Sequence, residues 1–232
     1  MATRQLLAGL LAVYEQRSGI AVAMESVGGV DAARRVQAGE AFDLVVLASD
    51  AIARLEAAGH VLAGSRTDLV HSGVAVAVRS GGALPELSCE ASVRQAVLAA
   101  TTIGYSTGPS GVALARLFER WGIAAEVQAR TVQAPPGVPV GSLVATGEVA
   151  LGFQQLSELM HLEGITVAGP LPPAIQITTT FSAGICAASQ RPDAVRRLLD
   201  FLASPETADA KRGQGMEPVS YTHLTLPTIY SV

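Results

Sequence analysis

The sequence predicts an α/β protein with a largely parallel sheet covered by helices, and three observations support this. Strand-length apolar runs alternate with amphipathic helical patterns along the chain, as they do in parallel sheets. The run FDLVVL at 42–47 is continuously apolar, which is typical of a strand covered on both faces. Finally, 232 residues allow one large domain or two lobes of about 100 residues each.

In the first part of the chain the patterns predict helix, strand, helix, strand, helix and strand. Ser49-Asp50 is expected to cap the third helix, which stops at Gly59. The apolar spacing places these elements at 6–18, 20–27, around 33–36, at 42–47, 49–59 and 70–78. Because a chain of this type should begin with a strand, whereas the first helix starts near residue 3, we expect a strand to precede this sequence in the intact protein.

The second part repeats the strand–helix rhythm. It predicts a helix at 93–100, a strand at 103–105, a helix with an apolar face from Leu114 to Trp121, and a strand at 149–153. A β-prone run at 175–189 and two amphipathic helices follow. Apart from His223, the tail 219–232 has no acidic or basic residue, and it is rich in Thr and β-branched side chains. We interpret it as a non-native tail that contributes to neither the fold nor the function.

The composition excludes several classes of protein. Hydrophobic residues make up 49% of the chain and charged residues 16%, so a buried core is expected and disorder is not. A net charge of −4 without any Lys/Arg cluster argues against nucleic acid as a partner. No apolar run approaches the roughly 20 residues that span a bilayer. The two cysteines, Cys89 and Cys186, are interpreted as small buried hydrophobic side chains rather than a disulfide or a nucleophile.

Gly104-Tyr-Ser106-Thr-Gly108 matches the G-x-S-x-G pattern of a serine-hydrolase nucleophile. A catalytic triad would also need an acid and a histidine further along the chain. Only His161 and His223 follow, no Asp lies between Ser106 and His161, and His223 belongs to the tail. We therefore keep a hydrolase only as an alternative and predict no catalytic residue.

The same loop fits anion binding better. Ser106, Thr107 and Ser110 lie where a helix begins, and unpaired N–H groups and the helix dipole attract anions there. Gly108 and Gly111 allow a ligand to approach the backbone closely. We therefore expect Ser106, Thr107 and Ser110 to contact an anion.

Three further strand-to-helix junctions offer neutral donors: Ser49, the helix start at Val138 to Val140, and Gln154. Ligands of parallel α/β sheets bind beyond the carboxyl ends of the strands, so these junctions are expected to converge on one cleft. The histidines and cysteines show no metal-ligand spacing, and neither G-x-G-x-x-G nor a Walker A sequence is present. We expect no metal and no cofactor.

Five segments together resemble the molybdate-binding-protein-like branch of bacterial ABC-transporter solute-binding proteins. The likeness covers about residues 1 to 218 and is specific only as a set. The segments are GVDAARRVQAG at 29–39, FDLVVLASD at 42–50, IGYS at 103–106, GFQQLSE at 152–158 and GMEP at 215–218.

The resemblance implies a two-lobed type 2 periplasmic-binding-protein fold, with two segments crossing between the lobes near 70–80 and 175–189. The first lobe would span 1–78, the second 79–181, and 182–218 would return to the first. Members of this branch hold an oxyanion with hydroxyls and amides, a role that falls here to Ser49, Val138, Val140 and Gln154. Thr180 stands near the position where molybdate-binding proteins have a tyrosine, so the anion itself stays open.

The implied function is capture of a small oxyanion or carboxylate, by hinge closure, for an ABC permease in the membrane. The protein would act as a monomer and would be periplasmic if a signal peptide lies upstream, since the sequence itself shows none; a cytoplasmic location stays open. An alternative is the effector-sensing domain of a transcriptional regulator, which has the same fold behind a DNA-binding domain.

Overall fold

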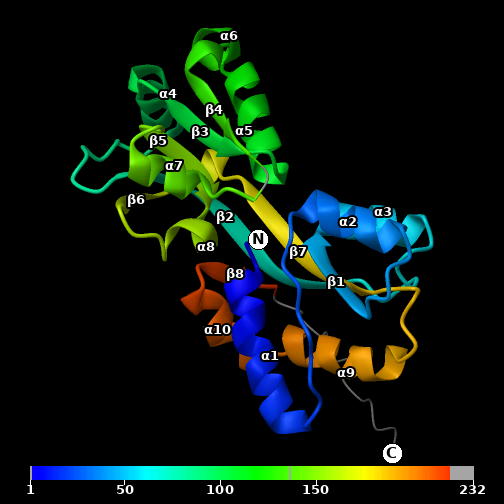
Figure 1. Cartoon of the computed structure of the whole chain (residues 1–232). Coiled ribbons are helices and arrows are strands. Elements are labelled where there is room, and N and C mark those ends of the chain that lie inside the picture. Colours follow the sequence, from blue (N-terminus) through cyan, green and yellow to red (C-terminus); the bar gives the residue numbers. More distant parts are fainter. Residues whose placement is uncertain (1, 136, 220–232) are drawn as a thin grey trace, which may run out of the picture.

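The computed structural model describes residues 2–135 and 137–219 and shows two sheets that share one long strand, β2 (Thr67–Arg79) (Figure 1). Each sheet is covered by helices and forms the centre of one lobe. The tail that we interpret as non-native lies outside the described residues except for Val219. No helix in the described ranges is long and apolar enough to cross a membrane.

The first lobe is built on the strand order β1 (Leu44–Ala48), β7 (Thr178–Ile185), the first half of β2, and β8 (Met216–Pro218). All its described strand pairs are antiparallel, so the prediction of a mostly parallel sheet is wrong for this lobe. The reason is topological. β1 and β2 run in the same direction, but β7 returns between them and pairs with both.

Helices cover both faces of the first sheet. On one face lie α1 (Arg4–Ser18), α9 (Pro192–Ala203) and α10 (Ala208–Gly213), and on the other α2 (Gly29–Gln37) and α3 (Ser49–Ala57) (Figure 1). Strand β1 contributes side chains to the hydrophobic cores on both faces of this sheet. Val45 and Leu47 pack towards α2 and α3, whereas Leu44 and Val46 pack towards α1 and α9.

The second lobe has the strand order β6 (Ile165–Pro170), the second half of β2, β5 (Leu151–Gln155), β3 (Ile103–Ser106) and β4 (Thr131–Ala134). Here β3 is parallel to both neighbours, as predicted, whereas β2 is antiparallel to both β5 and β6. The flanking helices are α4 (Glu90–Ala99), α5 (Pro109–Arg120), α6 (Ala124–Val127), α7 (Val140–Thr146) and α8 (Leu156–Leu159). Short 3₁₀ turns lie at Gln128–Arg130 and Pro173–Ile175 in this part, and at Pro205–Thr207 before α10.

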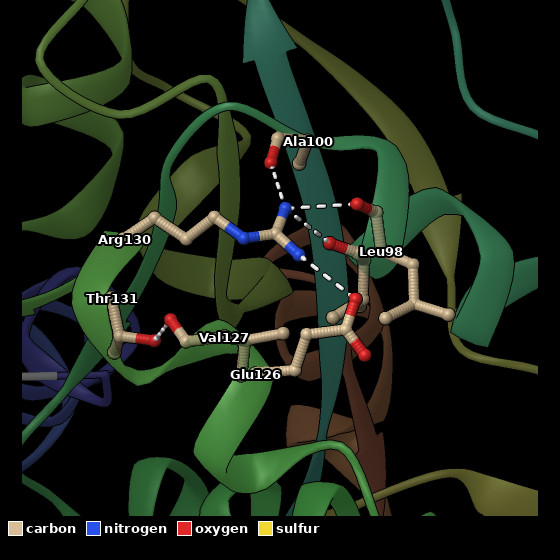
Figure 2. Close-up of polar contacts among 7 residues, drawn as sticks. Leu98, Ala100, Glu126, Val127, Arg130 and Thr131 are labelled. Atoms are coloured by element: carbon tan, nitrogen blue, oxygen red, sulfur yellow. Dashed lines mark hydrogen bonds and ion pairs between the residues drawn. The ribbon is translucent and has the colours of Figure 1, made fainter.

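Two close contacts fix the helices of the second lobe. A Cβ on Gly111 would lie only 1.7 Å from the carbonyl oxygen of Ser106, so glycine is what allows α5 to begin directly against the end of β3. At the far end of the lobe, Arg130 donates hydrogen bonds to the last carbonyls of α4, among them Leu98 at 2.9 Å and Ala100 (Figure 2). The guanidinium thereby satisfies acceptors that a helix C-terminus leaves unpaired.

The two crossing segments that were predicted are confirmed. Strand β2 changes partners between Gly73, which lies opposite Thr178 of β7, and Val74, which lies opposite Gln155 of β5. The chain returns through the segment just before β7. The lobes are therefore joined by β2 and by the segment that leads into β7, which is the connection expected of a hinge.

Three other expectations are wrong. The residues 20–27, expected to be a strand, form no regular element, and Ile20, Met24 and Val27 are exposed. A β-prone run becomes a strand only where a partner strand can pair with it. Cys89 is exposed at the start of α4, whereas Cys186 is buried, and both thiols are free. Strands β4, β6 and β8 lie where no strand was predicted.

One buried group had no signal in the sequence. Lys211 of α10 is the only lysine of the chain, and its side chain is 2% exposed. Desolvation by burial lowers the pKa of this amine to about 8.

Candidate functional site

A cleft of about 260 Å³ opens between the two lobes. It lies beyond the carboxyl end of β1 and beside the first turns of α5, where the chain crosses between the lobes. It is lined by Ala48, Ser49, Asp50, Pro109, Ala113, Ile177, Thr178, Thr179 and Thr180. Of these described lining residues, Asp50 is the only charged one and none is a lysine or arginine. The cleft therefore offers hydroxyls and helix starts as donors, rather than cations.

Ser49 is placed in the cleft by the junction of β1 and α3. Ala48, rather than Ser49, is the N-cap of α3, and no side chain caps the helix, which corrects our expectation. The Ser49 hydroxyl has no hydrogen-bond partner among the described residues, so it is available to a ligand. Asp50 pairs with Arg54 one turn along the helix at 2.8 Å, which offsets the charge of its carboxylate.

Thr180 enters the same cleft from β7. It lies opposite His71 of β2, and the His71 Nδ1 and the Thr180 hydroxyl are 2.9 Å apart. A hydrogen bond of 2.9 Å also joins the side-chain amide of Gln155 and the hydroxyl of Thr179. These contacts fix two hydroxyls at the point where the chain passes from one lobe to the other.

The loop before α5 lies near the cleft but does not line it. Pro109 and Ala113 of α5 are lining residues, whereas Ser106, Thr107 and Ser110 are not. The Ser106 hydroxyl accepts a hydrogen bond from the Gly108 N–H at 3.4 Å, and Ser110 is buried.

Val138, Val140 and Gln154 also lie outside the cleft lining. The register of the second sheet places the ends of β3 and β4 side by side, with Ser106 opposite Ala134, so these residues share one edge of the sheet with the α5 junction. Gln154 is buried there, accepting from the Gly141 N–H at 3.3 Å and donating to Glu158 at 3.0 Å. Val140 is buried and Val138 is exposed.

The structure gives no support to the hydrolase alternative. His161 is bound to Gln214, at 3.2 Å, rather than to Ser106. In the described ranges, no three His, Cys, Asp or Glu side chains gather as a metal site would require.

A second cavity of about 310 Å³ adjoins the cleft and shares Ala113 and Ile177 with it. Its other lining residues are Arg116, Leu117, Arg120, Ala174, Ile175 and Gln176. Sequence reasoning missed this cavity and the apolar lining of the cleft. The helical spacing of Pro109, Ala113 and Arg116 could have indicated that one face of α5 lines both the cleft and the cavity, since these positions lie on the same side of the helix.

The family model of the bacterial extracellular solute-binding proteins matches residues 1–217. The chain belongs to this family. An aconitate isomerase from a Pseudomonas species is 38% identical over 212 residues, which are 89% of this chain and 80% of that protein.

Solved structures share the fold of this solute-binding protein. The periplasmic molybdate-binding protein of Azotobacter vinelandii superposes with a TM-score of 0.75 at 19% identity, covering 93% of this chain and 95% of that chain. A tungstate ABC transporter structure from Geobacter sulfurreducens gives 0.69 at 15% identity, covering 89% and 91%. The two-lobed fold of type 2 periplasmic binding proteins is thus confirmed. At sequence identities of 19% and 15%, the two structures establish the fold and not the ligand.

Proposed function

We propose that this protein captures a small anion, a carboxylate or an oxyanion, in the interlobe cleft and presents it to an ABC permease. The observation that carries the proposal is that Ser49 and Thr180, far apart in the sequence, line one cleft with the start of α5. The unpartnered Ser49 hydroxyl and the N–H groups at the start of α3 are donors for an anion. Capture would close the lobes about the two crossing segments.

The Ser106, Thr107 and Ser110 loop, the Val138–Val140 helix start and Gln154 belong to this proposal as donors of the closed state. They lie on the edge of the second sheet next to the α5 junction, and closure of the lobes would bring this edge towards the ligand. Ser49 and Thr180 would contact the anion in the open state as well.

We favour an organic carboxylate over molybdate as the ligand. The protein named for aconitate is 38% identical to this chain, whereas the molybdate-binding protein is 19% identical. The cleft also carries Thr180 near the position at which molybdate-binding proteins have a tyrosine.

Calorimetry with aconitate, acetate, molybdate, tungstate, sulfate and phosphate tests the proposal. We expect at least one of these anions to bind the wild type. Ser49→Ala should weaken its binding about tenfold, because a hydrogen bond to a charged group is lost. Ser80→Ala, in the exposed turn after β2, is the matched control and should bind normally. If no anion binds below roughly millimolar, about −4 kcal/mol, the proposal is wrong.

Isomerisation of aconitate is the second candidate, and the 38% identity to an aconitate isomerase is the observation that favours it. A reaction that moves a proton needs an acid–base group at the ligand, and the Asp50 carboxylate is such a group in the cleft lining. Proton NMR distinguishes cis- from trans-aconitate directly. Interconversion by the wild type that Asp50→Asn abolishes would establish the activity, whereas binding without interconversion would exclude it.

A further inference from the structure

The cleft and the cavity next to it share Ala113 and Ile177, and their linings differ in chemistry. Pro109, Ala113, Arg116 and Arg120 recur every three or four residues and therefore lie along one face of α5. The first two line the interlobe cleft, and the last two line the adjoining cavity. One helix face thus connects a hydroxyl-lined end with a cationic end.

The two arginines of the cationic end differ in their partners. Arg120 pairs with Glu90 at 3.0 Å, and Glu90 also accepts a hydrogen bond from the indole N–H of Trp121 at 2.6 Å. The charge of Arg120 is therefore offset within the protein. Arg116 has no ion-pair or hydrogen-bond partner among the described residues, and its guanidinium is available to an anion from outside.

We propose that the ligand is a di- or tricarboxylate, with one carboxylate in the hydroxyl-lined cleft and a second bound by Arg116. This inference rests on the proposed function and deepens it. Arg116 lies about 4.5 Å along the helix axis from Ala113, where the two cavities meet. Helical side chains lean towards the N-terminus, which brings the guanidinium back towards the cleft. Arginine binds carboxylates through two parallel N–H groups, so it selects this group in particular.

This arrangement should make the binding affinity depend on how many carboxylates the ligand carries. A monocarboxylate fits the hydroxyl-lined end alone and gains nothing from Arg116. A di- or tricarboxylate spans both ends. Because Arg116 is exposed, its contribution should fall as the ionic strength rises, whereas that of the neutral hydroxyls should not.

Calorimetry with tricarballylate, succinate and acetate on the wild type, Arg116→Gln and Ser49→Ala tests the inference. Arg116→Gln should weaken tricarballylate and succinate about tenfold, leave acetate unchanged, and reduce the salt dependence of binding. Ser49→Ala should weaken all three. Arg196→Gln, on the surface of α9, removes the same charge away from the cleft and should change nothing.

The outcomes distinguish the inference from the proposed function. If the wild type binds carboxylates and Arg116→Gln affects none of them, or affects acetate as much as tricarballylate, the role of Arg116 is wrong and the proposed function stands. If the wild type binds none of the anions, the proposed function itself fails. Because Arg116 is exposed, an unchanged thermal melt of Arg116→Gln would exclude misfolding as the cause of a loss.

Discussion

The two lobes fill their interiors in different ways. In the second lobe, Phe118 lies 6.0 to 6.4 Å, between ring centroids, from Tyr105, Trp121 and Phe153. In the described part of the first lobe the ring contact is the single pair Tyr14–Phe201, at 5.4 Å, and the rest of that core is mainly aliphatic.

The first lobe also contains the groups that agree least with a well-packed interior. Lys211 is buried there, and the segment 19–28 exposes several apolar side chains. The second lobe has close helix–strand contacts at Gly111 and a guanidinium that caps α4. We infer that the second lobe is the rigid wall of the cleft and that the first is the more easily opened one.

The largest effect is expected at the junction of β3 and α5, in the lobe that we infer to be the rigid wall of the cleft. Gly111→Ala places a methyl group against the Ser106 carbonyl, and neither α5 nor β3 can move away easily. We expect a loss of about 3 kcal/mol in the free energy of unfolding, measured with urea. Gly108→Ala is the control, because its Cβ would meet the Ser106 hydroxyl at an ordinary 3.5 Å. Equal stability of the two variants would show that this junction is not tightly packed.

The second prediction concerns the buried amine of the first lobe. Burial lowers the pKa of Lys211 from 10.5 to about 8, so between these values the unfolded state binds more protons than the folded state. Stability should therefore rise with pH from about 8 to 10.5 and be lower below that range. Lys211→Met should remove this rise and be more stable at pH 7 by about 2–3 kcal/mol.

Urea titrations of both proteins at pH 7 and pH 10 measure this difference. Arg196→Gln, an exposed cation of the same lobe, should keep the pH dependence of the wild type. A Lys211 side chain that titrates with the pKa of free lysine would contradict the desolvation argument.

A smaller effect is expected at the α4 terminus of the second lobe. Arg130→Met removes the donors to Leu98 and Ala100, and to Val97 at 3.4 Å (Figure 2). We expect a loss of about 1–2 kcal/mol of stability by urea unfolding, because the carbonyls remain partly buried without a charged donor. Arg94→Met, on the exposed surface of α4 itself, should stay within about 0.5 kcal/mol of the wild type.

The smallest effect is expected in the segment 19–28. Met24 is 37% exposed, so Met24→Ser should change the free energy of unfolding by less than about 0.5 kcal/mol. Val97→Ala, at a fully buried position of the second lobe, should cost about 2 kcal/mol. A large loss in Met24→Ser would mean that this segment packs as firmly as the second lobe does.

The sequence predicted what local patterns determine. The alternation of strands and helices, the apolar run at 42–47 and the helical face from Leu114 to Trp121 all appear in the structure. Partner choice was not predictable, since β7 enters between β1 and β2 from a distant part of the chain.

The same distinction holds for the candidate site. Ser49 and Thr180 are polar residues at strand ends, and the structure brings both into one cleft. Pro109, Ala113 and Ile177 carry no chemical group that marks a site, so their place in the lining follows only from the packing of α5. The positions of Gln154 and of the Val138–Val140 helix start, away from the lining, depend on how the two lobes are oriented.

The burial of the only lysine has a consequence for chemical labelling. All exposed cationic side chains other than histidine are arginines, which do not react with amine-directed reagents. Such a reagent would modify the ε-amine of Lys211 only when the first lobe opens. The rate at which Lys211 becomes labelled would therefore report the opening of that lobe in the native chain, without any introduced probe.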